Sequence, residues 1–300
     1  MFTDNSRGRP FAKDPAVVKL GERYLMYYSV PPFGDGRQND GWAIGIATSS
    51  NLKNWVRIGE IAAEFDYERN GFCAPGAIVI NDRVELFYQS YGNGPKDAIC
   101  HATSNDGLSF TRNNNNPIWR PTGAWNNGRA IDADVAIRGD QIYLLAATRD
   151  ASGEIQMLTG AYGHLTAGIE DVHWVQLLDE PLLEPSLPWE QKCIEAPALL
   201  VRDGVFHLFY AGAYNCAPQQ IGHAVSENAL SWTRTNDKPL LSNGLPGEWN
   251  SSESGHPFVF EDAGLTYLFF QGSSDDGKTW QISSVEITWD GHSPSLAHAH

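Results

Sequence analysis

Four side chains capable of acid–base chemistry open apolar segments that lie about 60 residues apart, or about twice that, along the chain. They are Asp14 in Asp-Pro-Ala-Val-Val, Asp132 in Asp-Ala-Asp-Val-Ala, Glu195 in Glu-Ala-Pro-Ala-Leu and His256 in His-Pro-Phe-Val-Phe. Cleavage of a glycosidic bond uses two carboxyl groups on either side of that bond, one protonated and one ionised. Three carboxyl groups at equivalent places in a repeat are candidates for this chemistry, provided that the fold brings them to one site.

The elements that must position these side chains form a five-fold repeat. The segment 74–78, Ala-Pro-Gly-Ala-Ile, completes the set, and each segment leads through a tight turn into an aromatic and β-branched strand. These second strands are Tyr24 to Tyr28, Val84 to Tyr88, Ile142 to Leu145, Val205 to Tyr210 and Leu265 to Phe270. Self-similarity at a fixed period marks a repeat architecture. Short strands with turn signals and no long helical period indicate an all-β chain.

We therefore predict an all-β, five-bladed β-propeller with four-stranded antiparallel blades around a central channel. A propeller needs all its blades to protect its strand edges, so one catalytic domain, 1–300, is expected. Its blades are predicted at 11–64, 72–117, 129–180, 193–240 and 254–290. The first strand of each blade lines the channel and delivers its carboxylate to one mouth. The tail from His292 to His300 is expected to be unstructured.

The propeller places Asp14 in blade 1 across the channel from Glu195 in blade 4. A separation of about 6.5–9.5 Å leaves room for the attacking water of an inverting enzyme, whereas about 5 Å indicates a retaining enzyme with Asp14 as nucleophile. Asp132 in blade 3 lies beside Glu195, and a neighbouring negative charge raises the pKa of a carboxyl group. Asp134 shares the strand face of Asp132, because side chains alternate with a period of two. Either aspartate could therefore act on Glu195.

Aromatic and polar residues near the expected channel mouth are candidates for sugar contacts. Trp125, Trp189 and Trp249 each precede a channel strand. They either pack between blades or stack on a sugar ring, since an indole has apolar faces and a polar edge. Arg129 could bind a hydroxyl group or a substrate carboxylate, or neutralise the acidic cluster. His256 could bond within the core, bind substrate or ligate a cation. The remaining candidates are Trp42, Phe72, Tyr91, Tyr214 and Glu253.

Composition and charge restrict the partners. A net charge of −15 excludes nucleic acid, which requires a basic footprint, and disfavours anionic membranes and polyanionic sugars. A neutral carbohydrate is therefore the expected partner, and the oligomeric state is left open. The four cysteines lack metal-ligand spacing and are expected to be free thiols. The N-terminus has no signal-peptide pattern, and no segment approaches the roughly 20 apolar residues of a membrane span. These features predict a cytoplasmic protein, or a periplasmic or secreted one if a leader has been removed.

The opening segments resemble those of glycoside hydrolase family 43 over nearly the whole chain, residues 11–290. Asp14-Pro15 matches the Asp-Pro of blade 1, and Ile131-Asp132-Ala133 matches part of the Ile-Asp-Pro of blade 3. Glu195-Ala196-Pro197 matches Glu-Ala-Pro in blade 4, and Gly255-His256 matches Gly-His in blade 5. Blade 2 departs from the family pattern, since Cys73-Ala74-Pro75 replaces Trp-Ala-Pro. The related propeller families 32, 68, 117 and 130 are less favoured.

The resemblance implies a polysaccharide-degrading hydrolase with Asp14 as general base, Asp132 as pKa modulator and Glu195 as general acid. It further implies an arabinofuranoside or xyloside substrate, no required cofactor, and a hydrated calcium ion in the central channel near His256. Two other functions remain open at this point. One is a propeller that binds carbohydrate without cleaving it. The other is a phosphorylase, whose basic anion site would have to come from Lys13 and Arg129.

Overall fold

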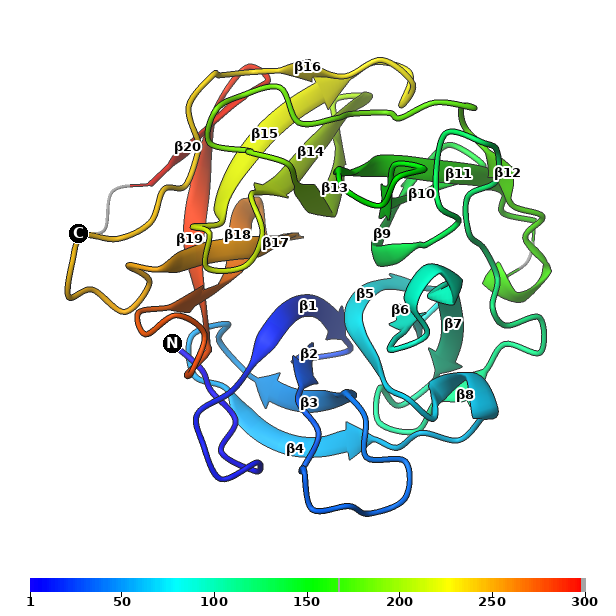
Figure 1. The fold of residues 1–300 in the computed structure, drawn as a ribbon, viewed down its shortest axis with the longest axis vertical. Helices are drawn as coiled ribbons and strands as arrows, with labels where there is room; N and C mark the ends of the chain where they lie inside the picture. The colour runs from blue at the N-terminus through cyan, green and yellow to red at the C-terminus, as the bar shows by residue number, and fades with distance from the viewer. Residues whose placement is uncertain (167, 298–300) are drawn as a thin grey trace.

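Five four-stranded antiparallel sheets surround a central channel in the computed structural model, which describes residues 1–166 and 168–297 (Figure 1). Blade 1 contains β1 (Lys13–Leu20), β2 (Arg23–Val30), β3 (Ala43–Ser49) and β4 (Val56–Ile61). Blade 2 contains β5 (Phe72–Ile80), β6 (Arg83–Ser90), β7 (Ile99–Ser104) and β8 (Thr111–Arg112). Blade 3 contains β9 (Ile131–Arg138), β10 (Gln141–Arg149), β11 (Gln156–His164) and β12 (Val175–Gln176).

The last two blades repeat this order. Blade 4 contains β13 (Ile194–Arg202), β14 (Val205–Gly212), β15 (Gln220–Ser226) and β16 (Thr233–Arg234). Blade 5 contains β17 (Glu253–Asp262), β18 (Leu265–Ser273), β19 (Gln281–Asp290) and β20 (Ser293–Leu296). The remaining regular elements are 3-10 turns at Asp66–Glu68, Gly94–Lys96 and Ile169–Asp171. The predicted five-bladed propeller is confirmed. The expectation of an unstructured tail is wrong for β20, which pairs with β19, while residues 298–300 lie outside the described part.

Each innermost strand begins with the same β-bulge. The bulged residue has a positive φ at Asp14 (52°), Ala74 (49°), Asp132 (55°), Ala196 (50°) and His256 (47°), and the strand register shifts at these points. Non-glycine residues rarely adopt this conformation, and bulges re-aim side chains next to active sites. The alignment of Glu195 with Asp14 is therefore wrong by one residue, because Ala196 holds the equivalent position.

Buried side chains hold the bulges in place. The backbone N–H of Asp14 donates to Gln271 Oε1 at 3.1 Å, and that of Asp132 donates to Gln89 Oε1 at 2.6 Å. Both glutamines come from the second strand of a neighbouring blade, β18 or β6. A buried N–H without a partner costs about 1–3 kcal/mol. These bonds therefore remove that cost and fix the two aspartates at the channel.

Three blades share a buried unit of a carboxylate, an arginine and a tyrosine. In blade 2, Glu68 accepts hydrogen bonds from Tyr88 Oη at 2.7 Å and Arg112 Nε at 2.8 Å. The matching units are Asp4–Arg57–Tyr28 in blade 1 and Glu190–Arg234–Tyr210 in blade 4. Each unit connects the segment before one inner strand, or the N-terminal segment, to the second and fourth strands of a blade. A paired and hydrogen-bonded charge is the form in which buried charges are tolerated.

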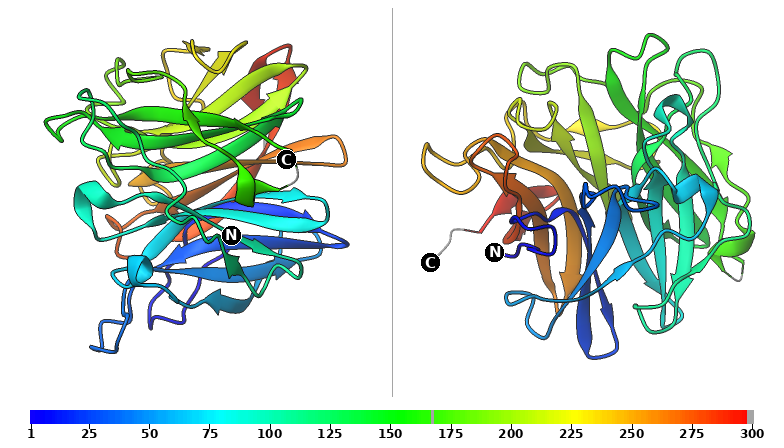
Figure 2. Two further views of the ribbon diagram at one scale, coloured as in Figure 1. Left: turned by 90° about the vertical axis from the view of Figure 1, so that its right-hand side faces the viewer. Right: turned by 60° about the horizontal axis from the view of Figure 1, so that its bottom comes forward.

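The N-terminal segment closes the ring against blade 5. The backbone groups of Phe2 and Ile282 exchange two hydrogen bonds of 2.8 Å, and the amide of Trp280 donates to the carbonyl of Pro10 at 3.1 Å. The side views in Figure 2 show this segment beside the edge of blade 5. The cysteines are free, as predicted, and Cys73, Cys100 and Cys193 are buried. Among the described residues, no helix has the length and apolar character needed to cross a membrane.

Candidate active site

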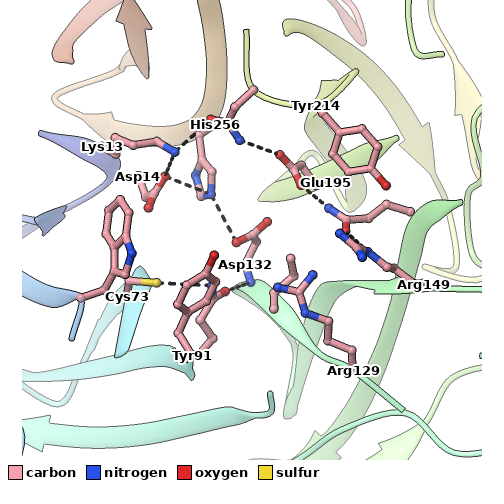
Figure 3. A pocket seen from close by; sticks show the side chains of 15 residues that line it. Lys13, Asp14, Cys73, Tyr91, Arg129, Asp132, Arg149, Glu195, Tyr214 and His256 are labelled. Carbon is pink, nitrogen blue, oxygen red and sulfur yellow. Dashed lines mark hydrogen bonds and ion pairs between the residues drawn. The ribbon is translucent and has the colours of Figure 1, made fainter. Parts of the chain in front are cut away.

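A cavity of about 190 Å³ opens where the innermost strands begin (Figure 3). Residues from all five blades line it, because the bulges of β1, β5, β9, β13 and β17 converge there. The lining consists of Lys13, Asp14, Trp42, Cys73, Gln89, Tyr91, Arg129, Ile131, Asp132, Arg149, Gln156, Glu195, Tyr214, Asn215 and His256. The structure thus brings together Asp14, Asp132, Glu195 and His256, the four side chains from which the sequence argument began.

His256 bridges two of the aspartates. Its Nε2 atom lies 3.4 Å from Asp14 Oδ1 and 3.4 Å from Asp132 Oδ1. Burial lowers the pKa of His256, but the charges of Asp14 and Asp132 outweigh it and raise that pKa to about 9. The imidazole is therefore a cation at neutral pH, and it holds two buried carboxylates that would otherwise repel each other.

Asp14 is the carboxyl group whose ionised form is favoured. Burial raises its pKa, but the positive charges of His256 and Lys13 more than offset that effect, so the pKa lies below its ordinary value. Lys13 Nζ lies 4.0 Å from Asp14 Oδ1 and donates to Asn215 Oδ1 at 2.9 Å. Within the described residues, the buried Oδ1 of Asp14 has no hydrogen-bond partner. Asp14 lines the cavity, so its ionised carboxylate can accept a proton from a water molecule there.

Glu195 has the opposite electrostatic character. Burial, followed by the charge of Asp132, raises its pKa to about 7. Its carboxyl oxygens accept hydrogen bonds from Gln156 Nε2, from Gln219 Nε2 at 2.7 Å and from Asn215 Nδ2 at 3.4 Å. These amides fix the orientation of the carboxyl group. Glu195 therefore stays partly protonated near neutral pH, where Asp14 is ionised.

The calcium ion implied near His256 stays a prediction. An imidazolium carries protons on both ring nitrogens, so only a neutral ring could bind the ion directly. His256 is held in the protonated form by Asp14 and Asp132 at 3.4 Å. In the part of the chain that the structure describes, no three His, Cys, Asp or Glu side chains are grouped as metal ligands. The imidazolium itself places a positive charge on the channel.

Some of the other candidate residues line the cavity, and the rest lie elsewhere in the fold. Trp42, Tyr91, Arg129 and Tyr214 line the cavity. Phe72 is buried against Tyr88 in the core, with ring centroids 5.5 Å apart. Trp125 and Glu253 are absent from the lining, and Glu253 is buried, where it accepts a hydrogen bond from the amide of Cys216 at 2.6 Å.

Two more tryptophans pack within blades. Trp189 stacks on Tyr210 at 5.9 Å and covers Gly212 and Gly222, where a Cβ atom would collide with the indole. Trp249 packs on Phe270 at 5.5 Å. Both residues thus pack against their own blade, whereas the packing alternative placed them between blades. Space for each indole exists because the strand beneath it carries glycine.

Asp134 lies away from the cavity that contains Asp132. It lines a separate, largely apolar cavity of about 310 Å³ formed by the middle parts of the inner strands. Its carboxylate accepts a hydrogen bond from the amide of Leu199 at 2.7 Å, and burial raises its pKa to about 7. The bulge separates the two aspartates, because the alternation that placed them on one face assumed a regular strand.

Several cavity residues were not predicted from the sequence. Arg149, which ends β10, is the most prominent, since its guanidinium group faces the cavity (Figure 3). Gln156 and Asn215 were also missed, although both bond Glu195. The second strands end at the same mouth where the first strands begin. That antiparallel geometry was the available signal for Arg149.

Fold and site together define a propeller enzyme that acts on glycosides, with carboxyl groups of opposed acidity in one cavity. The model of the family described as "Glycosyl hydrolases family 43" matches residues 4–292. The chain therefore belongs to glycoside hydrolase family 43. The resemblance inferred from the opening segments is confirmed.

Solved structures support the fold assignment. A thermostable family-43 glycoside hydrolase aligns over 100% of this chain and 96% of its own, with 21% identity and a TM-score of 0.76. An endo-1,4-beta-xylanase from Bacteroides thetaiotaomicron VPI-5482 aligns over 96% and 94%, with 22% identity and a TM-score of 0.73. A mutant alpha-L-arabinanase of Cellvibrio cellulosa aligns over 95% of each chain, with 16% identity and a TM-score of 0.68.

A curated relative matches this chain over only part of its length. The 1,2-beta-oligomannan phosphorylase of Thermoanaerobacter sp. (strain X514) is 27% identical over 209 residues, which cover 67% of this chain and 64% of that protein. The chain thus matches less than two thirds of that relative.

Proposed function

We propose that this enzyme hydrolyses its glycoside with inversion, with Asp14 as general base and Glu195 as general acid. The observation that carries the proposal is the opposed acidity of two carboxyl groups in one cavity. The pKa of Asp14 lies below its ordinary value, and that of Glu195 is raised to about 7. Paired titratable groups whose environments separate their pKa values divide the base and acid roles.

Each carboxyl group has one proton to move. Glu195 donates its proton to the glycosidic oxygen as the bond to the anomeric carbon breaks. Asp14 accepts a proton from the water that attacks the other face of that carbon. Asp132 modulates the pKa of Glu195 and, together with Asp14, keeps His256 charged. Exchange with solvent then restores both carboxyl groups.

An arabinofuranoside or xyloside is the favoured substrate. The cavity of about 190 Å³ is lined by Trp42, Tyr91 and Tyr214, whose rings can pack on the apolar face of a sugar. The xylanase and the arabinanase share this fold and act on polymers of the corresponding pentoses. These comparisons support the pentoside class without choosing between its two members.

Hydrolysis of nitrophenyl glycosides and plant oligosaccharides by the wild type and by Asp14→Asn and Glu195→Gln tests the proposal. Each variant should lose at least about a hundredfold in kcat/KM, the range of general acid–base catalysis. Glu195→Gln should lose more on oligosaccharides than on nitrophenyl glycosides, because nitrophenolate leaves without a proton. Asp82→Asn and Glu22→Gln change the same groups at exposed hairpin turns and should retain activity.

Proton NMR of the first-formed anomer tests the stereochemistry. An inverted product supports Asp14 as a base. A retained product would instead make Asp14 a nucleophile, and full activity in Asp14→Asn would remove it from the mechanism altogether.

A further inference from the structure

Two arginines stand side by side on one wall of the cavity, and the proposed hydrolysis uses neither. Arg129 lies two residues before β9, and Arg149 ends β10. Ala147 pairs with Ile131 across this hairpin, and the amide of Asn127 donates to the carbonyl of Arg149 at 3.1 Å. Both guanidinium groups therefore reach the cavity from the same end of blade 3 (Figure 3).

Buried partners orient both guanidinium groups through their Nε atoms and leave the terminal nitrogens without a bond to any described residue. Arg129 Nε donates to Asp97 Oδ2 at 3.2 Å, and Arg149 Nε donates to Gln156 Oε1 at 3.1 Å. Asp97 and Gln156 are each 1% exposed, so both anchors are fixed. In the described part of the chain, the terminal nitrogens of the two arginines have no hydrogen-bond partner, and no carboxylate lies within 4.0 Å of Arg149.

The cavity is richer in positive charge than the chain as a whole. The protein carries a net charge of −15, yet the cavity is lined by four cationic side chains and three carboxyl groups, namely Lys13, Arg129, Arg149, His256, Asp14, Asp132 and Glu195. His256 and Lys13 lie against Asp14. In the described part of the chain, Arg129 has a carboxylate partner and Arg149 has none, so an anion in the cavity would gain an attraction that no protein group now satisfies.

We propose that Arg129 and Arg149 form a binding site for an oxyanion, either a carboxylate on the substrate or inorganic phosphate. A guanidinium fork matches both groups through paired N–H···O bonds. Gln156 connects the site to the chemistry, because it bonds both Arg149 and Glu195. The inference rests on the proposed function, since the oxyanion lies in the cavity that holds the sugar.

The two sources of the oxyanion differ in what they do during turnover. A substrate carboxylate remains attached to the sugar and orients it beside Glu195. Free phosphate instead replaces the attacking water. Its oxygen then bonds the anomeric carbon, the glycosidic C–O bond breaks, and the leaving oxygen takes the proton of Glu195 to give a glycosyl phosphate.

Calorimetric binding of inorganic phosphate, D-glucuronate and D-xylose to the wild-type enzyme is the direct test. D-Glucuronate and D-xylose form a matched pair, because they differ by the carboxylate on C5. At least one of the two anions should bind about tenfold more tightly than D-xylose. Arg149→Met should abolish that difference, and Arg149→Lys should retain part of it, since lysine keeps the charge but not the fork. Arg120→Met, at an exposed arginine outside the cavity, should bind like the wild type.

Turnover in the presence of phosphate distinguishes the two sources. A glycosyl phosphate signal in the phosphorus NMR spectrum identifies phosphate as the ligand. Preferential cleavage of uronic-acid-bearing oligosaccharides, with water as the acceptor, identifies a substrate carboxylate. Equal binding of all three probes, or anion binding that Arg149→Met and Arg149→Lys leave unchanged, overturns the inference. Hydrolysis that is lost in Glu195→Gln would still support the proposed function in that case, so the two failures are distinguishable.

Discussion

Replacement of Asp132 by asparagine should neutralise His256. Two carboxylates lie 3.4 Å from its Nε2 atom, and each contributes about 5 kcal/mol at an effective dielectric constant near 20. That energy corresponds to roughly 3.5 pH units. The two charges together, opposed by burial, raise the pKa of His256 from 6.5 to about 9. Loss of one carboxylate should lower the pKa by about three units and leave the ring neutral at pH 7.

Titration of the imidazole C–H signals by NMR measures this change. The chain has nine histidines, so His256→Asn serves to assign the signal. Asp134→Asn is the matched control, because Asp134 lies in the other cavity, and it should leave both the His256 signal and kcat/KM unchanged. A pKa that stays above about 8 in Asp132→Asn, or an equal shift in Asp134→Asn, would refute the electrostatic reasoning.

Three further predictions concern acidity, substrate contact and stability. The kcat/KM of the wild type should fall as the pH rises through about 7, because Glu195 must be protonated to act as the acid; a pH–rate profile that stays flat to pH 9 would contradict this. Trp42→Ala should raise KM about tenfold in steady-state kinetics, which corresponds to a loss of about 1.4 kcal/mol of binding free energy. Trp189→Ala should leave KM unchanged but lower the free energy of unfolding by about 3–5 kcal/mol in urea. Glu68→Gln should lower the free energy of unfolding by about 3 kcal/mol, because Arg112 is left buried without its charge partner. Glu22→Gln is the control at an exposed glutamate. Equal urea midpoints for the two variants would show that the Glu68–Arg112 pair does not stabilise the fold.

The fold was accessible from the sequence because its signals are local and repeated. Each opening segment followed by a turn and an aromatic strand indicates one blade, and five such segments leave little choice of architecture. The convergence of Asp14, Asp132 and Glu195 followed from that architecture, since strands that line one channel start at one mouth. Arg149 was not predicted to line the cavity, because it stands at the far end of a second strand. Its partner Gln156 is close in space but belongs to the next strand.

The buried carboxylate units had a sequence signal that was not used. Glu68 and Glu190 stand at the same interval before Ala74-Pro75 and Ala196-Pro197. An alignment on these two features places Ala196, and not Glu195, opposite Ala74. Their arginine partners could not be predicted from the sequence. Arg112 and Arg234 come from outer strands, and no sequence feature distinguishes them from exposed arginines.

The bulges explain why one cavity can hold both an acid and a base. In a regular strand, successive side chains point to opposite faces, so Lys13 and Asp14, or Ile131 and Asp132, could not both line it. The bulge interrupts that alternation, and both members of each pair line the cavity. Asp14 and Asp132 occupy the bulged position and share the charge of His256, whereas Glu195 occupies the preceding position, outside direct contact with that charge. The one-residue offset of Glu195 thus allows its pKa to differ from that of Asp14. A carboxylate at position 196, the equivalent of Asp14 in blade 4, would have been the third one against the same imidazolium.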